Sequence, residues 1–226
     1  MMLARLLVRL TCLIAVGVVL SIAVGCKAQR FVTLEYVTPQ GTVKDGVASD
    51  TRRLFVYQTE ATSIVGLSQL GRLEEVVFEI PIRLSDFSFL NENQHIRVLH
   101  FMDCSFSSLD FLYGQSGLRD LVFQGCDLSP DGIDLSLLPS LEYLEITNSQ
   151  LRELPIRASD PSRLHKMKGL NVAYNQLTSI GPALQEVLRF FGFVVVAGNP
   201  LPVVPAGYLT GDLTEVLPSE YHRFIR

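Results

Sequence analysis

The stretch MKGLNVAYNQLTSI, residues 167–180, carries the pattern from which the fold is predicted. Apolar side chains stand at its first, fourth, sixth, eleventh and fourteenth positions, and Asn175 stands at its ninth. The alternation from Leu170 to Val172 is typical of a short strand with one buried side. A single unit of this size has too little apolar surface to form a core, so copies of it must stack. The stretch therefore predicts a repeat protein.

The same spacing recurs along most of the chain. The position that Leu170 holds in this stretch is held in the successive units by Leu54, Val76, Leu99, Leu121, Leu144, Leu170 itself and Val194. Consecutive members of this series are 22, 23, 22, 23, 26 and 24 residues apart. A fixed period of this length indicates an array whose units share one continuous core. We predict about seven repeats over residues 51–205.

This spacing resembles the leucine-rich repeat family. The resemblance implies an α/β fold, a solenoid with a curved parallel β-sheet on its concave face and turns and short helical segments on its convex face. At the position of Asn175, and of Asn199 in the last unit, the side chain is expected to bond buried backbone groups. Cys104 and Cys126 take this position in two neighbouring units. Buried free thiols are favoured there because the two Cβ vectors run parallel, and a disulfide between the repeats is the alternative.

Both ends of the array call for caps that cover its core. Residues 31–50 alternate partly before Gly41, which predicts a cap strand and a turn, and residues 206–226 are expected to form the C-terminal cap. One short amphipathic helix is predicted after Gly181, with Pro182 in its first turn. Its apolar side comprises Leu184, Val187, Leu188 and Phe191, and Gly192 is expected to end it.

The N-terminus has the sequence pattern of an export signal. Arg5 and Arg9 precede an uncharged run over residues 10–24, which is shorter than the ~20 apolar residues of a membrane-spanning helix. The run ends in Ala23-Val24-Gly25-Cys26, which resembles the lipobox of bacterial lipoproteins. That resemblance implies cleavage of residues 1–25 and acylation of Cys26, followed by a short tether and cap over residues 26–50. Ordinary secretion and an uncleaved anchor are the alternatives.

An acylated Cys26 predicts a protein anchored to a membrane of the bacterial cell envelope. In lipoprotein families an Asp after the cysteine commonly marks inner-membrane retention, and Lys27 stands there instead. The outer membrane is therefore favoured. Without the lipid, the protein would be secreted.

Charge and motifs exclude several function classes. The chain has 19 Lys and Arg against 23 Asp and Glu, a net charge of -4, which leaves no surplus for neutralising the phosphates of nucleic acid. It has no glycine-rich phosphate loop, Gly-x-Ser-x-Gly elbow or His-Glu-x-x-His sequence. We therefore expect no enzymatic activity, no cofactor and no metal.

The candidate binding residues follow from strand alternation, which turns the residues beside the core positions to the concave face. They are Phe55, Tyr57, Glu75, Val77, Glu79, Val98, His100, Met102, Asp120, Val122, Tyr143, Glu145, Asn171 and Tyr174. Apolar and aromatic side chains rimmed by charge are typical of a protein interface. Because the acids outnumber the single Arg53, the expected protein partner has a basic surface.

Three alternatives remain at this point. The side chains of the concave face pack against one another without binding anything, the protein is purely structural in the envelope, or it serves as an accessory domain of an enzyme complex.

Overall fold

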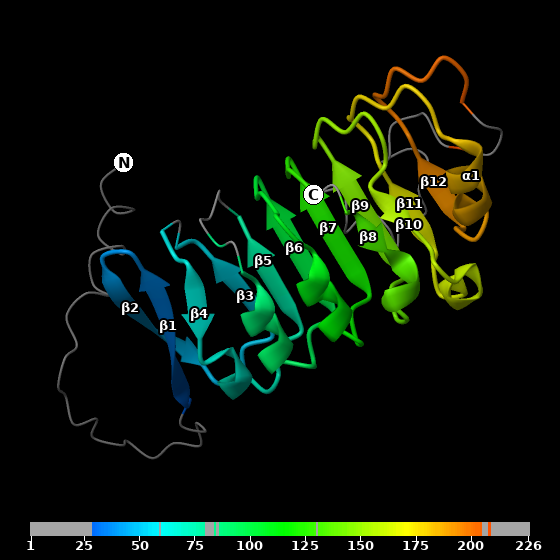
Figure 1. Ribbon diagram of the computed structural model, residues 1–226. Helices are drawn as coiled ribbons and strands as arrows, with labels where there is room; N and C mark the ends of the chain where they lie inside the picture. The colour runs from blue at the N-terminus through cyan, green and yellow to red at the C-terminus, as the bar shows by residue number, and fades with distance from the viewer. Residues whose placement is uncertain are drawn as a thin grey trace, which may run out of the picture.

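The computed structural model describes residues 29–58, 60–79, 84, 86–129, 131–204 and 208. The predicted signal peptide over residues 1–25, Cys26 and, except for Tyr208, the predicted C-terminal cap over residues 206–226 lie outside the described residues. The described chain forms an elongated stack that runs from β1 and β2 at one end to α1 and β12 at the other (Figure 1).

A seven-stranded parallel sheet forms one side of the stack, with the order β12-β11-β9-β7-β6-β5-β3. Its strands are β3 (Arg53–Val56), β5 (Glu75–Phe78), β6 (Val98–Met102), β7 (Asp120–Gln124), β9 (Tyr143–Thr147), β11 (Gly169–Asn171) and β12 (Phe193–Val195). The register is the predicted one, since each residue in the series from Leu54 to Val194 pairs with its neighbour in the series. The leucine-rich repeat solenoid is confirmed.

The N-terminal cap is an antiparallel sheet of three strands with the order β2-β1-β4. β1 (Phe31–Thr38) and β2 (Gly41–Ala48) form a hairpin, as the predicted cap strand and turn imply. Gly41 follows the turn with φ of 132°, a conformation that favours glycine. β4 (Ser63–Val65) pairs with β1, although the sequence assigned residues 63–65 to the first repeat. The cap therefore takes its third strand from the array.

Short elements cover the other side of the stack, as the resemblance to leucine-rich repeats implied. They are the 3₁₀ helices η1 (Leu67–Gln69), η2 (Ser88–Glu92), η3 (Asp110–Gly114), η4 (Leu135–Leu137) and η5 (Pro161–Leu164), the strands β8 (Ile133–Asp134) and β10 (Ile156–Arg157), and the helix α1 (Pro182–Leu188). α1 confirms the predicted helix but ends at Leu188, so the buried Phe191 lies beyond it. No helix among the described residues is long and apolar enough to cross a membrane.

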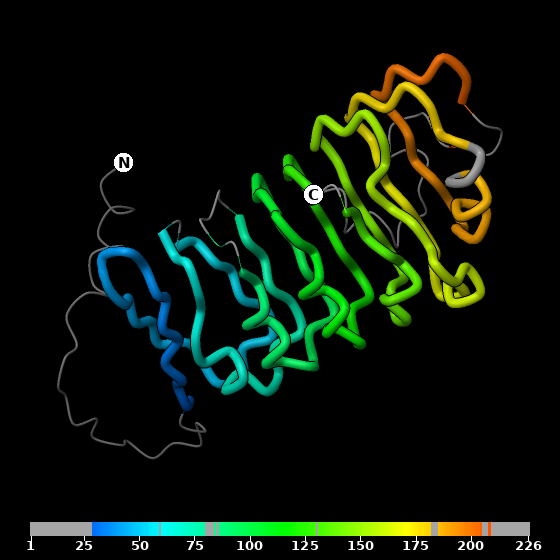
Figure 2. The backbone as a smooth tube through the Cα atoms, in the orientation of Figure 1, coloured from blue at the N-terminus to red at the C-terminus, as the bar shows by residue number. Residues whose placement is uncertain are grey.

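The core lies between the sheet and these short elements, as the successive turns of the chain in Figure 2 indicate. Phe78, Phe101 and Phe123 stack in consecutive repeats, with ring centroids 5.0 and 5.4 Å apart. These distances match the spacing of neighbouring strands, ~4.8 Å, because each ring stands at the same place in its repeat. Apolar packing repeated in register therefore holds the stack together.

Asparagines tie the last repeats together as predicted. The Nδ2 group of Asn175 donates to the carbonyl of Ile146 at 2.7 Å, and its Oδ1 atom accepts from the backbone N–H of Ser149 at 2.9 Å. Asn199 repeats the arrangement one unit later and donates to the carbonyl of Val172 at 2.9 Å. The two amides thus satisfy backbone groups at the bend after each strand.

Cys104 and Cys126 are buried free thiols, which confirms the favoured alternative. The thiol of Cys126 lies 3.4 Å from the carbonyl oxygen of Phe101, in the preceding repeat. A hydrogen bond with Cys104 lowers the pKa of Cys126, against the effect of burial. The cysteines therefore replace the asparagine ladder by weaker thiol contacts in two of the three repeats that hold the phenylalanine stack.

Candidate interaction surface

The candidate surface is the side of the seven-stranded sheet that faces away from the core, here called the open face. In β3, Leu54 and Val56 point into the core, so Arg53 and Phe55 point to the open face. The same alternation runs through β5 to β12 because all strands share one register. The predicted binding residues therefore lie on one face, as expected, but they differ in exposure.

A group at the N-terminal end of the open face, here called the N-terminal patch, comprises the exposed Arg53, Phe55 and Tyr57 and the half-buried Glu75 and Glu79. The rings of Phe55 and Tyr57 are stacked, with centroids 6.1 Å apart, and are 38% and 54% exposed. Arg53 lies over the Phe55 ring at 5.9 Å and donates to Glu75 at 2.6 Å. The patch thus combines two exposed rings with charges of both signs.

Glu79 fixes the second ring of the patch. Glu79 directly follows β5, and its carboxylate is hydrogen-bonded to the hydroxyl of Tyr57, which directly follows β3. Reduced hydration, together with the charge and hydrogen bond of Glu79, raises the pKa of Tyr57. The bond to Glu79 positions the ring for contact.

His100 lies next to the patch, between Val77 on β5 and Val122 on β7. Its side chain is half-buried, and among the described residues its buried Nε2 atom has no hydrogen-bond partner. Burial lowers the pKa of His100, while the nearby Glu75 and Glu79 act in the opposite direction. The imidazole is therefore neutral at pH 7 and belongs more to the packing of the face than to its charge.

Three predicted contact residues require correction, because Val77, Asp120 and Val122 are only 4%, 7% and 9% exposed. Neighbouring side chains on the sheet cover them, which is the alternative that the sequence left open. Alternation fixes the side of a sheet on which a residue lies, but not how far its neighbours cover it. These three residues form the floor of the open face rather than exposed contacts.

The C-terminal end of the open face is packed around Gly169. Gly169 pairs with Tyr143 on one side and Phe193 on the other, and a Cβ atom at Gly169 would overlap the Phe193 ring. The missing side chain lets Phe193 lie across β11, so its ring centroid is 6.4 Å from that of Tyr143. Lys168 covers the Tyr143 ring at 5.7 Å and pairs with Glu142 at 2.6 Å. The sequence did not predict this role of Gly169, because nothing in its own repeat indicates that the ring of Phe193 will lie over it.

Small and polar side chains complete this end. Val195 and Ala173 are fully buried in a cluster with Ala197 and Phe193. Glu145 is half-buried and accepts from the Thr147 hydroxyl at 3.0 Å. Burial raises the pKa of Glu145, against hydrogen bonds from Asn171 and Thr147. This carboxylate is thus engaged within the protein.

The remaining candidate residues are either intermediate in exposure or exposed at a distance from the N-terminal patch. Val98, Met102 and Asn171 are half-buried, and the Oδ1 atom of Asn171 accepts from the backbone N–H of Ala173 at 3.1 Å. Tyr174 is 57% exposed, in the left-handed conformation with φ of 56°. Among the described residues, no group of three or more His, Cys, Asp or Glu side chains is placed to hold a metal ion.

No protein-family model and no curated protein sequence matches the chain. Among solved structures, it is similar to an internalin (inlF) from Listeria monocytogenes, with 19% identity, a TM-score of 0.46 and coverage of 71% of this chain and 53% of that one. An internalin C2 (inlC2) from the same species has 19% identity and a TM-score of 0.41, with coverage of 71% of this chain and 79% of that one. The leucine-rich repeat domain of APL1B has 13% identity and a TM-score of 0.35, with coverage of 65% of this chain and 56% of that one. The chain spans about half the length of the first internalin. Its assignment to the leucine-rich repeat fold rests on its strand order, register and asparagine ladder.

Proposed function

We propose that this protein is a non-enzymatic component of the bacterial cell envelope that binds a protein partner through the N-terminal patch. The observation that carries the proposal is the stacked, exposed pair Phe55 and Tyr57, set beside the ion pair of Arg53 and Glu75. Exposed rings bordered by charged groups mark protein interfaces, and aromatic residues supply much of their binding energy.

The patch is held in position before it meets a partner. Arg53 and Phe55 stand on a strand of a continuous sheet, and Glu79 holds the hydroxyl of Tyr57. Side chains that are already ordered lose little conformational entropy on binding, so more of the contact energy appears as affinity. At the other end of the open face, by contrast, Phe193 and Val195 already pack within the protein.

The charge expected of the partner needs revision. Glu75 is paired with Arg53, while Asp120 is buried and Glu145 is engaged by Thr147. The acid excess counted from the sequence is therefore reduced, and Glu79 is the half-exposed acid beside the rings. Basic groups of a partner would meet the open face at Glu79, with a salt-sensitive association rate.

Site-directed crosslinking tests where the partner binds. A photoreactive phenylalanine analogue replaces Tyr57 in the full chain, and after illumination of intact cells the proposal expects a crosslinked protein. The matched control places the same analogue at Phe190, which is 36% exposed and lies 5.2 Å from Arg189, much as Phe55 lies near Arg53. Equal crosslinking at both positions, or none at Tyr57, would contradict the proposal.

The membrane anchor is a separate part of the proposal and rests on the sequence before Cys26. Cys26→Ser should abolish labelling by a radioactive fatty acid and release the protein from sedimented membranes, because the acyl chains supply the anchoring energy. Cys126→Ser serves as the control, since Cys126 is buried in the core. Undiminished labelling of the Cys26→Ser protein would refute the anchor and leave the binding proposal standing.

A further inference from the structure

A basic pocket lies outside the open face, at the edge of the sheet where its strands begin. Its volume is about 350 Å³, and its lining comprises Arg52, Gly71, Arg72, Glu74, His95 and Arg97. Arg52, Glu74 and Arg97 directly precede β3, β5 and β6, so they hold the same place in three consecutive repeats. Backbone hydrogen bonds of 2.8 and 2.7 Å join them in series. The repeat itself thus gathers these side chains.

The lining carries an excess of positive charge. Arg52 donates to Glu74 at 3.2 Å, which neutralises one guanidinium. Arg72 and Arg97 are exposed, and neither forms an ion pair with a carboxylate of a described residue. Counting its three arginines and Glu74, the lining has a net charge of two positive units, whereas the chain as a whole has -4.

The positive charge continues into the next repeat. The backbone N–H of Arg119 donates to the carbonyl of Arg97 at 2.8 Å, and the Arg119 side chain is exposed. Neighbouring strands are only ~4.8 Å apart, and like charges side by side on them are destabilising. Further along the edge, Glu142 and Lys168 neutralise each other at 2.6 Å. Among the described residues that directly precede the strands of the sheet, the arginines without an ion pair are therefore Arg97, in the pocket, and Arg119, at its border.

We propose that this pocket binds the phosphate group of a phosphate ester. Guanidinium groups present paired N–H donors that match the oxygens of phosphate, and a bound dianion would relieve the repulsion between Arg72, Arg97 and Arg119. The volume lies at the lower end of the range of small-molecule sites, ~300–1,000 Å³. It accommodates a phosphate group with the first atoms of its carrier.

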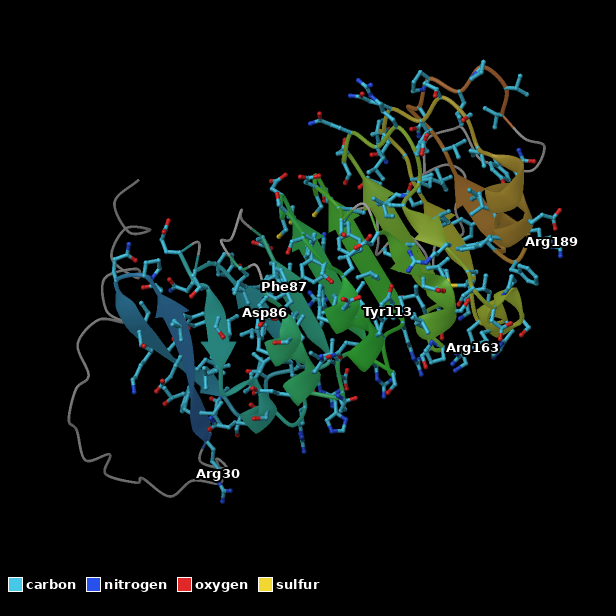
Figure 3. All side chains as sticks on the ribbon, in the orientation of Figure 1. Arg30, Asp86, Phe87, Tyr113, Arg163 and Arg189 are labelled. Carbon is cyan, nitrogen blue, oxygen red and sulfur yellow. The ribbon has the colours of Figure 1, made fainter. Side chains whose placement is uncertain are left out.

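The phosphate has two chemical sources, a soluble ester or a phospholipid headgroup. β1 starts at the same edge of the molecule, where Figure 3 shows Arg30 at its foot. Cys26 precedes Arg30 by four residues, so the acyl anchor proposed above would bring this edge towards the headgroups. The lipid source rests on that anchor, whereas the pocket does not.

Calorimetric titration of the full chain with inorganic phosphate tests the pocket. Phosphate should bind the parent protein, and the double variant Arg72→Gln/Arg97→Gln should bind it at least about tenfold more weakly, because two charge-assisted contacts are lost. The control variant Arg163→Gln/Arg189→Gln removes two exposed arginines near the other end of the stack (Figure 3) and should bind like the parent. The absence of phosphate binding to the parent, or equal losses in both variants, would overturn the proposal.

Vesicle flotation distinguishes the two sources. If a headgroup is the ligand, the parent should float better with phosphatidylglycerol vesicles than with phosphatidylcholine vesicles, and Arg72→Gln/Arg97→Gln should lose that preference. A preference that is unchanged in the variant, together with weakened phosphate binding, assigns the pocket to a soluble ester. Thermal unfolding without phosphate checks that the variants are folded.

Discussion

The two ends of the open face use aromatic side chains in opposite ways. At the N-terminal patch, Phe55 on β3 and Tyr57 just after it stack and remain exposed. At the C-terminal end, Phe193 lies across Gly169 towards Tyr143 and packs against a buried cluster. The strands have the same alternation at both ends, so the difference comes from the neighbours. Gly169 on β11 leaves space for the Phe193 ring, which therefore packs within the protein. The N-terminal patch has no such glycine, so the rings of Phe55 and Tyr57 remain available to a partner.

The largest effect that tests this comparison is expected at Val195, which is fully buried on the C-terminal end. Val195→Asp should lower the free energy of unfolding by ~3 kcal/mol or more, because a carboxyl group would lose its hydration among apolar side chains. Urea unfolding measures the loss. Val203→Asp is the control, since Val203 is 78% exposed and should change stability by less than ~0.5 kcal/mol. Similar small changes in both proteins would mean that this end is open to water.

A smaller effect is expected from Gly169→Ala. The new methyl group would overlap the Phe193 ring and displace it from the Tyr143 side, at a cost of ~1–3 kcal/mol in unfolding free energy. Gly117→Ala is the matched control, because a Cβ atom there comes no closer than 3.4 Å to another atom. Should the two variants be equally stable, the ring would not depend on the glycine, and the contrast between the ends would need another cause.

The smallest effect concerns His100, which lies beside the patch. Burial lowers its pKa in the folded protein, so between that pKa and its ordinary value of 6.5 the unfolded chain binds more protons. The stabilising contribution is therefore complete above pH 6.5 and is lost as the pH falls through the folded pKa. His100→Gln should flatten the dependence of unfolding free energy on pH in this window. An unchanged dependence would show that the imidazole is as hydrated as in the unfolded chain.

The sequence predicted the array well because the core positions repeat with nearly constant spacing. The register from Leu54 to Val194 follows from that spacing alone, and the asparagine ladder follows from the bend after each strand. β4 was missed because Ile64 also fits the pattern of a degenerate repeat, and its pairing with β1 is a contact with a distant segment. The register predicts the side of the sheet on which each residue lies, but the exposure of that residue depends on the length of the neighbouring side chains.

The same reason explains the errors at the candidate site. Val77 and Val122 flank His100, and nothing in their own repeats indicates that the assembled face would bury them. The basic pocket was also missed, because Arg52, Arg72 and Arg97 belong to different repeats and each reads locally as a solvated charge. Aligning the residue before each strand across repeats would have brought Arg52, Arg97 and Arg119 into one column.

The most direct test of the central claim is the affinity of the crosslinked partner for two variants of this protein. Phe55→Ala/Tyr57→Ala should weaken binding by ~1–3 kcal/mol with an unchanged melting temperature, because it removes the two exposed rings. Phe190→Ala, which removes a ring of similar exposure elsewhere, should bind like the parent protein. If the partner binds Phe55→Ala/Tyr57→Ala as tightly as the parent, the N-terminal patch is not the binding site and the account is contradicted.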